Sequence, residues 1–400
     1  MIADENGEYI YIVDTNNHII RSMNISTGEV RTFAGFPATS GSVDEIGTSA
    51  RFKLPKRGVR IKEKLYIADT GNHVIRVIDI PTKQVTTLAG QSGVAGGIDS
   101  TESAAGIARF NSPGDITTDE TFLYVADTGN HAIRRVDLNT GIVKTIAGSR
   151  GTTGLVDSVD GFPLFDSPEG IAWHDGILYV SDTGNHIIRK VDLATMRVSL
   201  VAGDIQCVEE TEVENDVVNV KKTCTGQPAG TSSFGDSTDG TGRTTSFNSP
   251  TGLNTDGNYL YVMDTATNRI RRVKMDTGET KTFSYSLNKG VSLNSPAGAD
   301  LAGEVLYIAD RGNHSIRKLN ITSLDSAPLI LIAGNLGTYG YGYSSGYSAS
   351  FFNPVGITAD NMGNLYVADT GNHTIRKVVI STGEVTTIAG IPGRAGFVNS

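Results

Sequence analysis

Short apolar stretches recur along the chain in groups of four, separated by clusters of polar turn residues. In the last group they cover roughly 355–359, 364–368, 373–379 and 384–389, and they are rich in Val, Ile, Thr and Tyr. Stretches of this length and composition are typical of β-strands. The Asp-Asn-Gly, Thr-Gly-Asn and Ser-Thr-Gly clusters between them are typical of turns. The pattern predicts four-stranded units joined by tight turns, without intervening helices.

This group of four stretches occurs seven times. Each copy carries a version of the string LYVADTGNHTIRK, found at residues 365–377, between its second and third stretches. The motif aspartates are Asp14, Asp69, Asp127, Asp182, Asp264, Asp310 and Asp369. Repeated units of four antiparallel strands are the signature of a β-propeller, and the Thr-Gly hairpins disfavour a solenoid of parallel strands. We predict an all-β fold in which residues 1–400 form a single β-propeller, with seven blades favoured and six plus an overhang as the alternative.

The repeated string resembles the NHL repeat, a family named after its Asn-His-Leu core. The resemblance rests on Asn-His-x-Ile-Arg preceded by Leu-Tyr-Val-Ala-Asp, and it extends over nearly the whole chain. It implies a propeller, although NHL propellers most often have six blades. It also implies three classes of function: extracellular or sensor domains that bind proteins, glycans or each other, lyases that hold metal ions through histidines, and RNA-binding domains with a basic face.

Turn geometry explains the repeated motif without any ligand. We expect its Asp to accept hydrogen bonds from backbone amides two or three residues further on, and its Gly to supply a positive φ. We expect the repeated Asp and Arg to tie blades together through charged hydrogen bonds. The structural signature positions are Asp69, Asn72, His73, Arg76, Asp127, Asn130, His131, Arg134, Asp369, Asn372, His373 and Arg376.

The recurring motif histidine raises the alternative of a metal site. In a propeller, however, equivalent positions lie around a wide circle, farther apart than the ~4 Å between ligands that share one Zn²⁺ at ~2.1 Å. No Ser-His-Asp, Cys-His or paired-carboxylate spacing stands out from the repeats. We therefore predict no catalytic residue, no metal ligand and no cofactor, and we keep a metal-dependent lyase or hydrolase of the NHL type as the alternative function.

The segments that link one blade to the next are the parts that do not repeat. In a four-stranded meander these linkers lie on the same face as the motif turns, and insertions gathered on one face usually mark an interaction face. The long linkers are 36–50, 91–108, 149–164, 204–246 and 335–350. Within the last of them, tyrosines alternate with Gly and Ser, which suits an adaptable contact surface: Tyr339, Tyr341, Tyr343 and Tyr347.

Cysteines and sequons bear on the cellular compartment. Both cysteines, Cys207 and Cys224, fall in the insert 204–246, which has no His. They predict a disulfide, and hence an oxidising compartment, with a free reactive pair as the alternative. The sequons at Asn24 and Asn320 are candidate glycosylation acceptors. Those at Asn313 and Asn372 are discounted because the turn engages the Asn. We therefore predict an extracellular or cell-surface glycoprotein.

Charge and hydropathy limit the partners. The net charge of −9 disfavours a nucleic-acid-binding face, so RNA binding is a second alternative only. No apolar run approaches the ~18 residues that a membrane span needs. The N-terminus carries no secretory signal and matches the repeat at 356–369, so we interpret the chain as part of a longer protein. We predict a non-catalytic module that binds a protein or glycan, or associates with itself, through the long-linker face.

Overall fold

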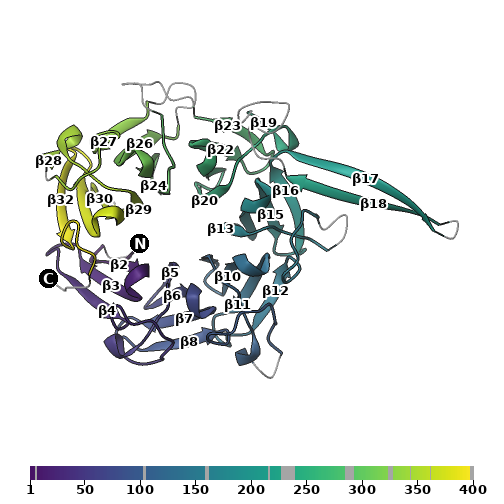
Figure 1. The fold of residues 1–400 in the computed structure, drawn as a ribbon, viewed down its shortest axis with the longest axis horizontal. Coiled ribbons are helices and arrows are strands. Elements are labelled where there is room, and N and C mark those ends of the chain that lie inside the picture. The colour runs from purple at the N-terminus through teal and green to yellow at the C-terminus, as the bar shows by residue number, and fades with distance from the viewer. Residues whose placement is uncertain are drawn as a thin grey trace. The chain divides into compact units, whose positions relative to one another are not determined.

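The computed structural model describes residues 1–4, 7–101, 105–157, 162–214, 217–226, 239–283, 292–322, 328–342, 344–360 and 362–396. These residues form seven four-stranded antiparallel sheets, each with its strands in chain order (Figure 1). The predicted all-β, seven-bladed β-propeller is confirmed. No α-helix occurs among the described residues. The predicted strands of the last repeat agree with those observed to within a residue or two.

The blades are numbered here in chain order. Blades 1 to 4 contain β1 (Ile2–Ala3), β2 (Tyr9–Asp14), β3 (Ile19–Asn24) and β4 (Val30–Ala34); β5 (Arg57–Ile61), β6 (Lys64–Asp69), β7 (Val74–Asp79) and β8 (Val85–Ala89); β9 (Asp115–Thr118), β10 (Phe122–Asp127), β11 (Ala132–Asp137) and β12 (Val143–Ala147); β13 (Pro168–His174), β14 (Ile177–Asp182), β15 (Ile187–Asp192) and β16 (Arg197–Ala202). Blades 5 to 7 contain β20 (Pro250–Thr255), β21 (Tyr259–Asp264), β22 (Arg269–Lys274) and β23 (Glu279–Thr282); β24 (Gly298–Ala302), β25 (Val305–Asp310), β26 (Ser315–Asn320) and β27 (Ile330–Ala333); β29 (Pro354–Ala359), β30 (Asn364–Asp369), β31 (Thr374–Val379) and β32 (Glu384–Ala389).

Short elements lie between and beside the blades. The two-residue strands β19 (Gly240–Thr241) and β28 (Ser344–Ser345) extend the outer edges of blades 5 and 7. The hairpin of β17 (Ile205–Glu214) and β18 (Val217–Gly226) follows blade 4. Three-residue 3₁₀ helices form the motif turns: η1 (Thr15–Asn17), η3 (Thr70–Asn72), η5 (Thr128–Asn130), η6 (Thr183–Asn185), η8 (Thr265–Thr267), η9 (Arg311–Asn313) and η11 (Thr370–Asn372). Others lie in the linkers: η2 (Gly47–Ser49), η4 (Ala105–Ile107), η7 (Gly242–Thr244) and η10 (Gly346–Ser348).

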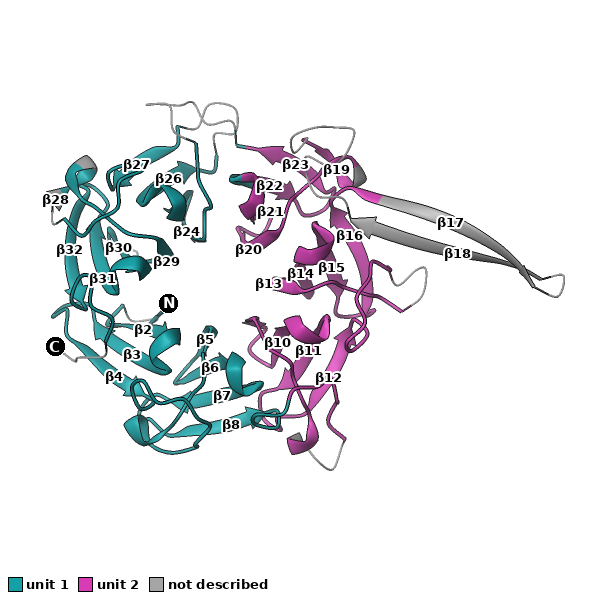
Figure 2. Ribbon diagram, in the orientation of Figure 1, with its two compact units in different colours: residues 1–94, 268–270, 283–400 teal, residues 95–267, 271–282 magenta. Residues whose placement is uncertain are grey.

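The chain divides into two compact units (Figure 2). Unit 1 comprises residues 1–94, 268–270 and 283–400 and holds blades 1, 2, 6 and 7. Unit 2 comprises residues 95–267 and 271–282 and holds blades 3 and 4 and most of blade 5. The single domain over residues 1–400 stays a prediction. None of the helices in the described part of the chain is long and apolar enough to cross a membrane.

In each unit the core lies between the faces of neighbouring sheets. In unit 2, Tyr124, Phe165 and Leu178 belong to a buried cluster that joins blades 3 and 4. A second cluster joins blades 4 and 5 and contains Tyr179 and Phe247. In unit 1, equivalent clusters join blades 1 and 2, blades 6 and 7, and blades 7 and 1. Successive side chains of a strand point to opposite faces of the sheet, and both faces are packed against a neighbouring blade. This explains why the strand sequences are nearly continuous in apolar residues.

Two backbone devices recur in the blades. The register between the third and fourth strands shifts directly before the motif Arg in six blades, as at Ile133/Arg134, and such bulges redirect a side chain. The glycine after the linker proline permits close approach of inner strands. A Cβ at Gly170 of blade 4 would overlap the carbonyl oxygen of Thr251 in blade 5, so no side chain fits there.

Candidate functional site

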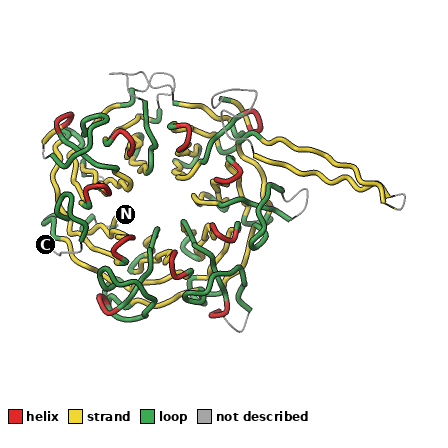
Figure 3. Tube along the Cα trace, in the orientation of Figure 1, coloured by secondary structure: helices red, strands yellow, loops and turns green. Residues whose placement is uncertain are grey.

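The motif between the second and third strands is a 3₁₀ turn that ends at the histidine (Figure 3). In blade 4 the turn Thr183–Asn185 is followed by His186, whose φ is 58°. The motif histidines of the other five blades that carry one share this left-handed conformation. The motif glycines, including Gly184, do not adopt it. The prediction that the glycine supplies the positive φ is therefore wrong, because the histidine supplies it.

The motif glycine serves a close contact with the incoming linker. The N–H of Gly184 donates to the carbonyl of Asp166 at 2.9 Å, and a Cβ at Gly184 would lie 2.5 Å from the Asp166 Cγ. The same N–H to linker hydrogen bond recurs in the blades that have Gly at this position, as between Gly71 and Lys53. In blade 4, glycine leaves the space that the Asp166 side chain occupies, and a side chain at this position would displace it.

The motif aspartate bonds to the linker, to the side chain of the turn Asn and to the next strand. In blade 4, Oδ1 of Asp182 accepts from the N–H of Asp166 at 2.7 Å. Its Oδ2 accepts from the Asn185 amide at 2.9 Å and from Arg189 at 3.4 Å. No side-chain cap of the 3₁₀ turn is formed. In this blade the aspartate thus bonds to the side-chain amide three residues further on and not to a backbone amide of the turn, so the prediction of backbone acceptance is wrong here.

The other signature sets repeat this arrangement. Oδ1 of each aspartate accepts from a linker N–H at 2.7–2.8 Å, and Oδ2 accepts from the motif Asn at 2.7–2.8 Å and from the motif Arg at 2.7–3.2 Å. The sets are Asp69 with Asn72 and Arg76, Asp127 with Asn130 and Arg134, and Asp369 with Asn372 and Arg376. The predicted charged pairing of Asp and Arg is present, but it lies within one blade rather than between two.

In blades 2 to 5 the motif arginine is fully buried between two carboxylates and one aromatic ring. In blade 3, Arg134 donates to Asp127 at 2.7 Å and to Asp99, a residue of the linker, at 2.9 Å. Its guanidinium lies 5.1 Å from the centre of the Phe110 ring. Asp99 also accepts from the N–H and hydroxyl of Thr145 on the outer strand. The arginine therefore fastens the incoming linker onto its own blade.

The linker aspartate is a functional part of the network that our sequence interpretation missed. The equivalent residues of the other blades that have one are Asp44, Asp157 and Asp239. The sequence does contain a signal for these aspartates. Each one follows an apolar residue or Thr and stands 32 to 35 residues before the motif arginine that it bonds. These aspartates lie outside the motif that defined the repeat.

Burial determines the ionisation of the motif carboxylates. It raises the pKa of Asp69, Asp127 and Asp310 to about 6 and that of Asp182 to about 7, against the opposing effect of the Asn, Arg and backbone donors. Asp182 is 0% exposed. Each carboxylate is bonded through both oxygens and shielded from solvent, so it cannot reach a substrate as an acid or base.

The motif histidine links one blade to the next. Nδ1 of His131 accepts from the N–H of Ser167 at 2.9 Å, and Nδ1 of His186 accepts from Ser249 at 3.0 Å. An imidazole that accepts at Nδ1 is neutral and carries its proton on Nε2. Burial lowers the pKa of His73, His186 and His314, which favours this neutral form. The Nδ1 lone pairs of His131, His186 and His314 are engaged in the fold rather than available to a metal.

Where the residues are described, the structure shows no cluster of three or more His, Cys, Asp and Glu side chains that could hold a metal ion. The site residues outside the motif occupy separate places. Tyr339 and Tyr341 are exposed by 67% and 57%, and the Tyr339 ring packs 4.9 Å from Phe352. Tyr343 and the side chain of Tyr347 lie outside the described residues.

The two glycosylation candidates adopt the same local geometry. The Asn24 Oδ1 accepts from the hydroxyl of Ser26 at 2.7 Å, and the Asn320 Oδ1 accepts from that of Thr322 at 2.6 Å. Glycosylation at either residue stays a prediction. The register of the hairpin β17–β18 places Cys207 opposite Cys224. Their side chains lie outside the described residues, so the disulfide also stays a prediction.

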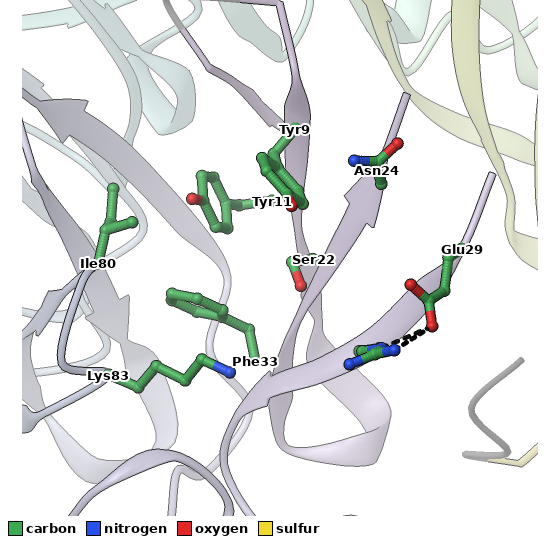
Figure 4. Close-up of a pocket in the computed structure, with 9 residues that line it drawn as sticks. Tyr9, Tyr11, Ser22, Asn24, Glu29, Phe33, Ile80 and Lys83 are labelled. Atoms are coloured by element: carbon green, nitrogen blue, oxygen red, sulfur yellow. Dashed lines mark hydrogen bonds and ion pairs between the residues drawn. The ribbon is translucent and has the colours of Figure 1, made fainter. Parts of the chain in front are cut away.

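A cavity of about 330 Å³ lies in unit 1 between blade 1 and the turn that follows β7 (Figure 4). Tyr9, Tyr11 and Phe33 contribute aromatic rings to it, and Ser22 and Lys83 contribute polar groups. It lies at the ends of β2 and β3 that are remote from the motif turn. No sequence pattern pointed to it, because it arises where one blade departs from the repeat.

The comparisons with known proteins agree with the geometry of the repeat. The profile described as the NHL repeat matches residues 351–378. NHL repeat-containing protein 2 of Bos taurus is 34% identical over 159 residues, which are 37% of this chain and 21% of the bovine protein. The chain is an NHL-repeat protein. The NHL propeller is also 27% identical to the Arabidopsis thaliana protein SUPPRESSOR OF QUENCHING 1, chloroplastic, over 299 residues. The aligned region covers 70% of this chain and 25% of the Arabidopsis protein.

The NHL chain thus spans only a fifth to a quarter of these two relatives. Among solved structures, a streptogramin B lyase matches it with a TM-score of 0.55 and 11% identity, over 96% of this chain and 92% of that chain. At this identity the likeness shows the propeller fold alone. The site chemistry therefore has to be argued from the residues of this chain.

Proposed function

We propose that this NHL propeller is a non-catalytic interaction module that binds a protein partner through its linker face. The observation that carries the proposal is the use of the repeated polar groups. Both oxygens of the motif Asp, the guanidinium of the motif Arg and the Nδ1 of the motif His are bonded inside the fold. Because these side chains are bonded inside the fold, they hold the linkers in place. The exposed side chains of the linkers are then the groups that can contact a partner.

The exposed apolar side chains of the linkers support a protein partner. Several linker residues are exposed by more than 40%: Phe36, Val43, Ile46, Ile98, Ile107, Phe162, Tyr339 and Tyr341. Aromatic residues are enriched at the centres of protein interfaces, and Tyr in particular contributes large contact area at low entropic cost. The Tyr339–Phe352 pair beside His314 fixes one such aromatic surface in unit 1.

Affinity capture with matched variants tests the proposal. The wild-type chain, the double variant Tyr339→Ser/Tyr341→Ser and the control Met362→Ser would be immobilised and exposed to native extract, with retained proteins quantified by mass spectrometry. Met362 is 64% exposed but lies in the turn between β29 and β30, away from the linkers. We expect a partner whose Kd is weakened at least about tenfold in the double variant and unchanged in the control. Equal retention by all three proteins would reject the linker face.

The compartment belongs to the same proposal. We infer an extracellular or cell-surface location, with a Cys207–Cys224 disulfide and a glycan at Asn320, because directly opposed cysteines in an antiparallel hairpin and an exposed sequon suit a secreted protein. Intact mass spectrometry of the native protein should show thiol alkylation only after reduction. Alkylation of both cysteines without reduction, together with an unmodified mass, would refute the inference.

A further inference from the structure

The cavity of blade 1 lies at the ends of β2 and β3 that are remote from the motif turn, and it borders the linker 36–50, because the Gly47 N–H donates to the carbonyl of Lys83. Tyr9 begins β2, Asn24 ends β3, and Lys83 lies between β7 and β8. Figure 4 shows the rings of Tyr9, Tyr11 and Phe33 around one space, with the Lys83 side chain running alongside Phe33. Its volume of about 330 Å³ falls within the range of small-ligand sites.

Ser22 is the residue that opens this cavity. It pairs with Tyr11 across β2 and β3. At the equivalent position, blades 3, 4, 6 and 7 have a long basic residue: Arg135, Lys190, Lys318 and Lys377. In blade 3 the guanidinium of Arg135 covers the Phe122 ring, which corresponds to Tyr9, at 4.5 Å. Serine is too short to do so, and the aromatic rings of blade 1 stay uncovered.

The tyrosine hydroxyl of blade 1 is also used differently. In blades 3, 5 and 7 this hydroxyl donates to an aspartate of the turn between the first two strands, as Tyr124 does to Asp119 at 2.8 Å. In blade 1 the aspartate in that turn, Asp4, pairs instead with Arg60 at 2.8 Å. Within the described residues the Tyr11 hydroxyl makes no hydrogen bond. Burial raises the pKa of Tyr11 to about 12, so this group remains a protonated donor.

The remaining polar groups of the cavity are mostly donors. The Asn24 Oδ1 is engaged by Ser26 and Thr27, which leaves the amide N–H groups of Asn24 for another acceptor. The Lys83 ammonium lies 5.6 Å from the centre of the Phe33 ring and forms no ion pair with a described residue. Glu29, the acidic member of the lining, accepts from Arg31 at 2.7 Å. Aromatic surfaces beside uncommitted donors and one cation favour a ring that carries an anion.

We propose that this cavity binds a small carboxylate built on a six-membered ring. The rings of Tyr9, Tyr11 and Phe33 contact the faces of the ligand, and Lys83 pairs with its carboxylate. The Tyr11 hydroxyl and the Asn24 amide donate to its remaining oxygens. Aromatic acids and uronic acids share this chemistry, because aromatic side chains pack against planar rings and against the C–H faces of pyranoses.

Isothermal titration of the full chain, produced in a bacterial host so that Asn24 is unmodified, tests the proposal. The probes are 4-hydroxybenzoate and glucuronate, with 4-hydroxybenzamide and glucose as neutral counterparts. We expect one molecule of at least one acid to bind per chain, and its neutral counterpart to bind at least about tenfold more weakly, because a charge-assisted bond is lost. Binding of 4-hydroxybenzoate would identify the ligand class as aromatic acids, and binding of glucuronate would identify it as uronic acids. Absence of binding by both acids at about 10 mM, or equal binding of a neutral counterpart, overturns the proposal.

Three variants locate the binding. Ser22→Arg, which installs the residue of blade 3, should abolish binding while the thermal midpoint stays near that of the wild type. Lys83→Ala should weaken binding of the acid at least about tenfold. Lys190→Arg is the control. It replaces one basic residue by another at the position of blade 4 that corresponds to Ser22, and it should leave binding unchanged. If Ser22→Arg binds like the wild type, the ligand lies elsewhere and the assignment of this cavity is wrong.

Discussion

Blades 4 and 5 perform the same structural task with different residues. Blade 4 has the full motif, with Gly184, Asn185 and His186, whereas blade 5 has Ala266, Thr267 and Asn268 in their places. Both blades keep the buried Asp and Arg, which lie 3.4 Å apart in each. Both also keep the phenylalanine beneath the guanidinium. Two of the residues that vary, Gly184 and His186, have backbone groups as partners, whereas Asn185 also bonds to the Asp182 carboxylate.

The histidine position shows what the fold requires. His186 accepts from the Ser249 N–H through Nδ1 at 3.0 Å, and Asn268 accepts from the Ser295 N–H through Oδ1 at 2.5 Å. Both residues adopt the left-handed conformation, with φ of 58° and 61°. The requirement is for a side-chain acceptor on a left-handed residue, which His and Asn both satisfy. The buried charged pair has no such substitute in either blade.

Loss of the buried cation should have the largest effect. Arg189→Met leaves the Asp182 carboxylate without its cation and unfastens Asp157 of the linker. We expect a loss of about 3–5 kcal/mol in the free energy of unfolding, measured by denaturant titration. Lys190→Met is the control, because Lys190 is partly exposed and points to the opposite face of the sheet. Its free energy of unfolding should stay within about 0.5 kcal/mol of the wild-type value. A loss below about 1 kcal/mol for Arg189→Met would show that the pair is dispensable.

The glycine position should give the next largest effect. Gly184→Ala copies blade 5, but the added Cβ would lie 2.5 Å from the Asp166 Cγ. In blade 5 the linker lies farther away, because the Ala266 N–H is 3.1 Å from the Asn248 carbonyl, against 2.9 Å at Gly184. We expect a loss of about 1–3 kcal/mol from overpacking, measured by thermal and denaturant unfolding. Gly106→Ala, with no atom within 4 Å of the added Cβ, serves as the control. Equal stabilities would mean that the linker adjusts freely.

The sequence predicted the fold well because strands, turns and blade number all follow from local periodicity. Asp369, His373 and Arg376 identified the turn and its structural role, but not their partners. The linker aspartates, such as Asp99, were missed because they lie outside the repeated motif, 32 to 35 residues before the arginine that they bond. The glycine was misassigned because positive φ is its commonest use, whereas Gly184 serves a tertiary contact. The cavity at Ser22 depends on an absent side chain, which no motif records.

The histidine position should give a smaller effect that depends on the replacement. His186→Ala leaves the Ser249 N–H without its acceptor and places alanine in the left-handed region, so we expect a loss of about 1–2 kcal/mol. His186→Asn copies blade 5 and should stay within about 0.5 kcal/mol at neutral pH. Asn268→Ala should cost about as much as His186→Ala. Equal losses for the Ala and Asn variants would assign the role to packing of the imidazole rather than to its acceptor.

The smallest effect is a pH dependence that separates His from Asn at this position. Burial lowers the pKa of His186, with Asp166 acting in the opposite direction. The unfolded chain, with an ordinary pKa of about 6.5, therefore binds the proton more readily than the folded chain. The stability contributed by neutral His186 is complete above that value and is lost as the pH falls below it.

The Asn variant lacks this titration, so the two proteins should be equally stable at about pH 7.5 and the wild type should be the less stable at about pH 5.5. Asp182, whose pKa is raised to about 7, changes stability in the opposite sense, but it is present in both proteins and cancels in the difference. Paired urea titrations across this range measure that difference directly. A difference that does not change with pH would mean that protonated His186 keeps its contact with Ser249 through a reoriented ring. The equivalence of blades 4 and 5 would then hold for shape but not for hydrogen bonding.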